Sequence, residues 1–175
     1  LAGPQSLDEL RAMAQRFGAA IPVGEKVPQQ APTSLMDSSD KSYQQTGARR
    51  LDLLFAFESL PNSSPQALAF LCHWLNAAKP GGLLAQLHEC GLTDSLKAAP
   101  LYQFAGQALL HIEFTLPANA TPNGIRERLL DWLGFFASQQ PWTRLREEYA
   151  ALQLRQQQVS GALQLARLDS EQRET

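Results

Sequence analysis

Three histidines are the residues of this sequence best suited to catalysis or metal binding. His88 stands in the run His88-Glu89-Cys90, which combines metal-ligand and general-base side chains. Neighbours at i and i+1 on a helix point to different faces, so these three side chains cannot meet at one ion. His73 lies beside Trp74 in an apolar segment. We therefore expect structural roles for both His73 and His88.

His111 and Glu113 are a second candidate pair. They are two residues apart in an alternating segment, so they share one face of a strand. A surface polar pair is the simpler interpretation, and contact with a peptide or a neighbouring domain is the functional one. Gly81 and Gly82 precede a short helical segment and are either a plain turn or a place where backbone N–H groups meet a ligand.

The sequence contains none of the short motifs that define an active site by themselves. It has no H-E-x-x-H or H-x-x-E-H zinc motif, no C-x-x-C pair, no G-x-S-x-G nucleophile elbow and no G-x-x-x-x-G-K phosphate loop. We expect Cys72 and Cys90 to be small core side chains, because no basic neighbour favours a thiolate. We assign no catalytic residue, no metal ligand and no bound cofactor to this chain.

Composition narrows the class of protein. The 175 residues include 15 Lys and Arg against 17 Asp and Glu, for a net charge of −2, so the positive field of a nucleic-acid binder is missing. The hydrophobic fraction of 44% supports a core, yet no apolar run approaches the roughly 18 residues of a membrane span. We expect no nucleic-acid or membrane partner and a cytoplasmic location. The periplasm stays open, because the chain does not begin with Met.

The elements that position these residues begin with five expected helices. Ser6 and Glu9 form a capping box, and an apolar stripe follows it. Ser64 and Thr121 each precede a proline, the usual order of a cap and a first helical residue. The expected helices begin near Ser6, Ser64, Gly82, Thr121 and Trp142. The last is expected to continue past Gly161, which weakens it.

Three strands are expected between the helices. Segments 49–60 and 108–116 alternate, while 93–104 is irregular and its Pro100 favours an edge or a bulge. Because 49–60 is partly apolar on both faces, we expect it inside a sheet with one face covered. Strand pairs joined by turns, with helices grouped between them, predict an α+β fold rather than a doubly wound α/β fold.

Residues 22–48 differ from the rest of the chain. They hold Pro22, Pro28 and Pro32 with paired Gln and show no sustained period. This is the composition of a linker, so the segment is a candidate domain boundary.

Several segments resemble the pitrilysin/insulinase family of zinc metallopeptidases. Leu53-Leu54-Phe55-Ala56-Phe57 resembles the first strand of that family's second domain, and 80–92 resembles its Gly-small-Leu-x-x-x-Leu-(Lys/Arg)-x-x-Gly segment. Residues 110–116 resemble the family's next strand, and 125–138 and 142–161 resemble the two helices after it. Residues 1–10 and 17–22 resemble the end of the family's first domain.

The resemblance implies a metallopeptidase-like α/β roll with a mixed or antiparallel sheet packed against several helices. Residues 1–21 would end a catalytic-type domain, 22–48 would link domains, and 49–175 would form a second, non-catalytic domain. The family's H-x-x-E-H motif and its later Glu ligand belong to the first domain. Zinc is therefore implied for the parent enzyme, while this fragment should bind none and be inactive alone.

In that family the second domain helps to wall a chamber that admits peptides. The implied partners are a peptide substrate and neighbouring domains of the same chain, and His111, Glu113, Gly81 and Gly82 are the candidate peptide contacts. The compact, Gln- and Ala-rich style is similar to that of bacterial members that process the precursor peptide in pyrroloquinoline quinone biosynthesis. Pitrilysin itself and a processing-peptidase-like subunit are alternatives within the family.

A protein of a different class would fit the same residues. An inactive family paralogue acting as a protein-interaction subunit would keep the fold without the zinc motif, and an unrelated α+β binding domain is a third reading. An H-x-x-E-H motif upstream of Leu1 would favour the enzyme, and its loss would favour the interaction subunit.

Overall fold

The structure is a computed structural model that describes residues 3–28, 30–35, 47, 49–61, 64–139 and 142–173. Within these residues it is an α+β fold, as predicted. Its elements are α1 (Leu7–Ala20), β1 (Arg50–Phe57), α2 (Ser64–Asn76), α3 (Leu83–Glu89), β2 (Ser95–Phe104), β3 (Gln107–Thr115), α4 (Pro122–Gln139), α5 (Trp142–Val159) and α6 (Ala162–Arg173). Much of the proposed linker, 36–46 and 48, lies outside the described residues.

The chain divides into two compact units. Residues 32–142 hold the sheet with α2, α3 and α4, and residues 1–31 with 143–175 hold α1, most of α5 and α6.

The sheet of the first unit is antiparallel throughout its described strands. Its order is β1-β3-β2, so β3 is central and β1 lies at an edge. The expectation that 49–60 lies inside a sheet is therefore wrong for the described strands. The prediction relied on the apolar residues on both faces of this strand. Such a pattern indicates which faces of a strand are covered, but it does not indicate whether the strand has a neighbour on each side. Leu54, on the less covered face of β1, is 59% exposed.

Strand β2 behaves as its proline predicts. It forms the other edge, and its pairing with β3 shifts register between Pro100 and Tyr102. Ala105 and Gly106 make the tight turn to β3 with φ of 49° and 78°. The side chain of Asn76 at the end of α2 accepts a hydrogen bond from the Ala98 N–H and donates one to the Ala98 carbonyl, at 2.7 and 2.8 Å. These bonds satisfy backbone groups on an edge strand that would otherwise face water.

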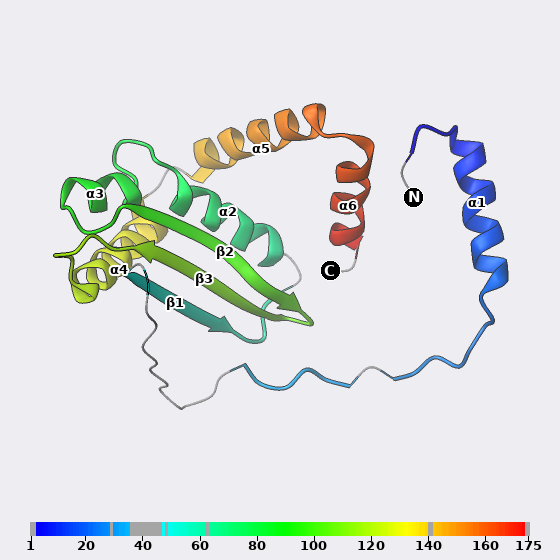
Figure 1. Cartoon of the computed structure of the whole chain (residues 1–175), viewed down its shortest axis with the longest axis horizontal. Helices are drawn as coiled ribbons and strands as arrows, with labels where there is room; N and C mark the ends of the chain where they lie inside the picture. Colours follow the sequence, from blue (N-terminus) through cyan, green and yellow to red (C-terminus); the bar gives the residue numbers. More distant parts are fainter. Residues whose placement is uncertain are drawn as a thin grey trace. The chain divides into compact units, whose positions relative to one another are not determined.

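Helices cover one face of this sheet. Along β3 the side chains alternate between buried and partly exposed, and Ala108, Leu110, Ile112 and Phe114 are the buried ones. Helix α2 packs on β2, and Ile125 and Leu129 of α4 are fully buried. Figure 1 shows α2 and α4 behind the sheet, on the same side. The opposite face of the sheet carries the partly exposed set.

An aromatic cluster joins α2, α4 and the start of α5. Trp132 and Phe136 stack at 4.7 Å between ring centroids, and Trp142 meets Phe136 edge-on at 5.0 Å. Phe70 lies about equally far from Phe136 and Trp142, at 6.3 and 6.1 Å. These rings extend the core beyond the sheet.

The second unit is helical. The capping box of α1 is confirmed: the Ser6 hydroxyl accepts from the Glu9 N–H, and the Glu9 carboxylate accepts from the Ser6 N–H. The apolar stripe of α1 is exposed, with Phe17 at 70%, and no residue of this helix is buried.

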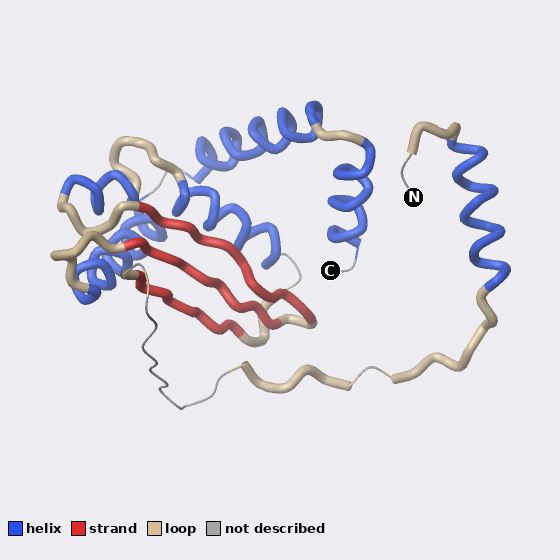
Figure 2. The backbone as a smooth tube through the Cα atoms, in the orientation of Figure 1, coloured by secondary structure: helices blue, strands red, loops and turns tan. Residues whose placement is uncertain are grey.

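The single long helix expected from Trp142 onward is wrong. It divides into α5 and α6 at Ser160-Gly161, and Figure 2 shows the loop between them. The Ser160 hydroxyl donates to the Gln156 carbonyl at 2.6 Å, and this bond competes with the backbone hydrogen bonds that would continue the helix. Gly161 also disfavours a continuous helix, because glycine loses more conformational entropy on folding than other residues do. Within the described part of the chain, no helix combines the length and apolarity that a membrane crossing requires.

Candidate functional site

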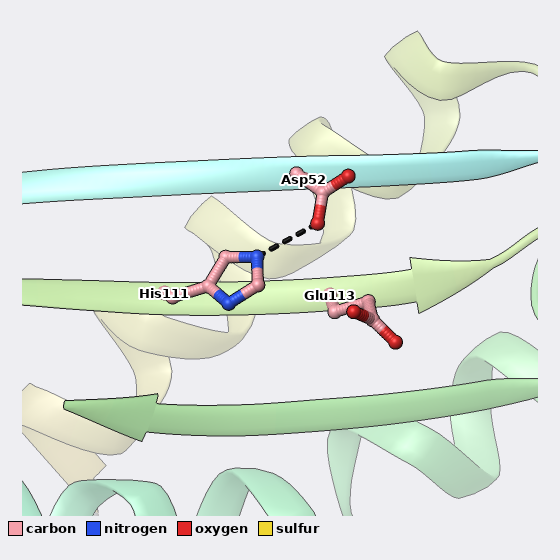
Figure 3. Close-up of side chains that lie close together, drawn as sticks. All are labelled: Asp52, His111 and Glu113. Carbon is pink, nitrogen blue, oxygen red and sulfur yellow. Dashed lines mark hydrogen bonds and ion pairs between the residues drawn. The ribbon is translucent and has the colours of Figure 1, made fainter. Parts of the chain in front are cut away.

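The sheet face that none of the described helices covers holds a cluster of Asp52, His111 and Glu113. His111 and Glu113 lie two residues apart on β3, and the pairing register places Asp52 of β1 directly opposite Glu113. His111 Nε2 is 2.7 Å from Asp52 Oδ1. Figure 3 marks this contact with a dashed line. One donor atom from each of the three residues lies within 4.8 Å of the other two.

Two basic residues border this cluster. The Arg50 guanidinium pairs with Asp52 Oδ2 at 2.8 Å and with Glu113 Oε2 at 3.2 Å. Lys97 of β2 is the cross-strand partner of Glu113. The side chains of His111, Asp52 and Glu113 are 22%, 29% and 31% exposed, so the cluster is half-buried and reachable from water. It offers a bound molecule charges of both signs.

The same face becomes apolar toward the β2–β3 turn. His111 is paired with Leu54, Ala56 with Leu109, and Leu109 with Tyr102 on the other side. Leu54 and Tyr102 are exposed. A peptide strand lying on this face would therefore meet charged groups at one end and apolar surface at the other.

Gly81 and Gly82 are in a different part of the fold from this cluster. They form the turn before α3, with Gly81 at φ 79° and Gly82 as the N-cap residue. The Gly82 N–H already donates to the Lys79 carbonyl at 2.9 Å. Figure 1 shows the α2–α3 connection beyond the end of the sheet and not over its open face.

The remaining histidines and cysteines have separate surroundings. His88 Nε2 lies 3.0 Å from the Asp94 carbonyl, and His73 packs edge-on to Trp74. Cys72 is buried, and its burial raises the pKa of the thiol. Cys90 is exposed, so its expected core position is wrong. It is the C-cap residue of the short helix α3, one position beyond the helix whose Leu83 and Leu87 are buried.

Sequence reasoning missed Asp52 and Arg50. The alternation of 49–60 places both on the polar face of a strand, but only the register with β3 brings them to His111 and Glu113.

A hollow of about 470 Å³ between the end of α3 and α4 was also missed. It is lined by Cys90, Leu92, Gly124, Glu127, Arg128 and Asp131. Its lining comes from segments that are more than thirty residues apart, so no local pattern predicts it.

The zinc motif of the pitrilysin/insulinase family does not fit this chain. That motif needs two histidines and a glutamate spaced as H-x-x-E-H, and the sequence has no such run. Asp52, His111 and Glu113 come from two strands and are a different arrangement.

Comparison with known proteins gives close relatives. Coenzyme PQQ synthesis protein F of Pseudomonas protegens is 55% identical over 174 residues, which are 98% of this chain and 21% of that protein. The protein of the same name from Pseudomonas syringae pv. tomato is 51% identical over 95% of this chain and 21% of its own length. In Pseudomonas aeruginosa the identity is 35% over 77% of this chain. The chain thus spans about one fifth of these relatives.

Other comparisons add little. No family model matches the chain. A crystal structure of pitrilysin superposes with a TM-score of 0.43 and 17% identity, over 50% of this chain and 10% of that one. The identities to the Pseudomonas proteins confirm the resemblance to the pyrroloquinoline quinone branch. Over nearly its whole length the chain is therefore similar to a segment of about one fifth of Coenzyme PQQ synthesis protein F from these Pseudomonas species.

Proposed function

We propose that this chain is the non-catalytic part of a zinc metalloendopeptidase and that its open sheet face forms part of a peptide-binding chamber. One observation carries the proposal: helices cover one face of the sheet, while the other keeps a row of partly exposed side chains. Antiparallel sheets often leave one face to water, and here that face combines the charged cluster of Asp52, His111 and Glu113 with exposed Leu54 and Tyr102. The names of the relatives direct the proposal toward pyrroloquinoline quinone biosynthesis.

The division of the chain is part of this proposal. Residues 1–21 would complete a preceding catalytic-type domain, 22–48 would link the domains, and 49–175 would form the second domain. The uncovered apolar stripe of α1 supports the first of these assignments, because such a stripe normally packs against another surface. Zinc and the residues that use it would lie outside this chain.

The open face would act by holding the peptide in place. Binding and orientation raise the rate of a reaction without any chemical group from this domain. Leu54 and Tyr102 would contact apolar side chains of the peptide, and Glu113 and His111 would pair with its polar groups. Gly81 and Gly82 remain weaker candidates, since their turn lies beyond the sheet.

An inactive paralogue that serves as an interaction subunit is the alternative. The lack of an H-x-x-E-H motif in this chain is compatible with both functions, because the resemblance places that motif in a preceding domain. The two functions predict different behaviour of the full-length protein. A peptidase would bind a catalytic zinc and cleave the peptide, and an interaction subunit would do neither.

The test uses the full-length parent protein, its zinc content and its cleavage of the precursor peptide. We expect at least one zinc per chain, and Tyr102→Ala and Leu54→Ala each to raise KM about 3- to 10-fold with unchanged zinc content. Arg128→Gln, on the hollow beside α4, is the matched control and should leave KM unchanged. Absence of zinc and of cleavage would favour the interaction subunit. Cleavage that neither open-face variant alters would show that the peptide binds elsewhere.

A further inference from the structure

We propose that Asp52, His111 and Glu113 bind a divalent transition-metal ion on the open face of the sheet. This site is separate from the zinc implied for the catalytic domain, and it does not depend on the chamber function. Among the residues that the structure describes, this is the one group of three or more His, Cys, Asp and Glu side chains whose possible donor atoms lie within 4.8 Å of one another.

The geometry of the strands supports the site. Asp52 and Glu113 are directly opposite each other in the antiparallel pair, and His111 follows on the same face of β3 two residues away. Opposite residues of such a pair have Cβ atoms about 5 Å apart, so the backbone already holds the three donors close together. No large movement of the chain is needed to close them around an ion.

The donor set indicates the class of ion. One imidazole and two carboxylates suit first-row metals such as zinc, whereas magnesium and calcium prefer oxygen donors alone. The partly exposed rim leaves further coordination positions for water or a ligand.

Arg50 holds the two carboxylates together in the metal-free protein. Its guanidinium bridges Asp52 and Glu113, which would otherwise repel each other across the strand pair. The Arg50 side chain is 46% exposed and long enough to turn into water, so a metal ion can take over its charge-balancing position. Lys97, opposite Glu113, stays as the second cation beside the site.

The sequence offers a competing metal site that the structure does not assemble. His88, Glu89 and Cys90 are adjacent in the chain, but His88 Nε2 lies against the Asp94 carbonyl. This run therefore supplies a matched control for the proposed site.

The test is a calorimetric titration of the 175-residue chain with Zn²⁺, followed by NMR of the histidine rings. We expect one bound ion and a shift of the His111 ring. His111→Ala should weaken binding at least about 10-fold, since loss even of a supporting residue costs that much. The double variant His88→Ala/Cys90→Ser should bind as tightly as the parent, and circular dichroism checks that every variant is folded.

Arg50→Gln separates a metal site from an ion-pair network. Removal of the competing cation should tighten Zn²⁺ binding several-fold, an effect that a purely structural role of the cluster would not produce. Unchanged or weaker binding by Arg50→Gln would overturn the proposal, as would loss of binding in His88→Ala/Cys90→Ser. Absence of any Zn²⁺ binding by the folded parent chain would do the same.

Discussion

Gly82 occupies a point where two backbone carbonyl groups converge. A Cβ atom built there would lie 2.9 Å from the Ala77 oxygen and 3.0 Å from the Lys79 oxygen. Its φ of −74° suits any residue, so close approach, and not backbone freedom, requires glycine. This packing accounts for a residue that the sequence offered as a ligand contact.

We expect Gly82→Ala to destabilise the chain by about 1–3 kcal/mol, because the backbone must move to accommodate the methyl group. The matched control is Gly134→Ala in α4, where a Cβ meets nothing within 4 Å. Its higher helix propensity should stabilise the chain by up to about 1 kcal/mol. Urea unfolding followed by tryptophan fluorescence measures both variants, and equal effects would contradict the packing argument.

At the scale of elements, α1 shows a helix whose start is fixed locally. Its capping box is complete although none of its side chains is buried. The pKa of Glu9 is lowered, first by the hydrogen bond from the Ser6 N–H and then by the bond from the Ser6 hydroxyl. Both bonds favour the ionised carboxylate.

The capping box therefore predicts a pH dependence of α1. A carboxyl group with a lowered pKa stabilises the folded form above its ordinary value of 4.5, and this contribution is lost as the pH falls through the lowered value. NMR should show the Glu9 carboxyl titrating below 4.5 in the parent chain. In Ser6→Ala the pKa should move back upward and the helix content of residues 7–20 should fall. An unaltered Glu9 titration in that variant would show that the box does not form.

The strands depend on more than local sequence. The alternation of residues determines which side chains share a face, and the pairing with other strands determines where each strand lies in the sheet. Both β1 and β3 alternate, yet β3 is central and β1 is an edge. The difference arises because β3 pairs with its hairpin neighbour β2 and also with a strand some fifty residues earlier in the chain.

At the scale of the whole molecule, the buried core lies within one unit. The described hydrophobic side chains that are buried all fall between Leu68 and Phe136. The compact unit of 32–142 thus contains them all, together with the sheet and the helices α2, α3 and α4.

We expect a truncated chain of residues 32–150 to fold cooperatively. It keeps every buried core residue that the structure describes, and it keeps Trp142, whose ring meets Phe136 edge-on. Its thermal midpoint should lie within about 5 °C of that of the 175-residue chain, equivalent to about 1 kcal/mol. Differential scanning calorimetry tests this, and a chain that does not unfold cooperatively would show that the helical unit is needed for the core.

The local chemistry of the chain was readable from the sequence. The Ser6–Glu9 capping box marked the start of α1, and Pro100 marked an edge strand with a bulge. Each depends on backbone geometry that a few neighbouring residues determine. The α+β class followed from the order of these elements, and the family resemblance added the expectation of a chamber-forming domain.

Only the tertiary structure brought together Asp52, Arg50, His111 and Glu113, because the β1–β3 register joins residues some sixty positions apart. The same holds for the exposure of Cys90 and for the edge position of β1, since both depend on what packs alongside. The sequence by itself determined the three strands, the helices as far as the start of α5 and their order, and it showed that this chain holds no H-x-x-E-H run. Strand pairing and side-chain packing decided which polar residues meet. Both depend on the free energy of the whole chain, which no short segment determines.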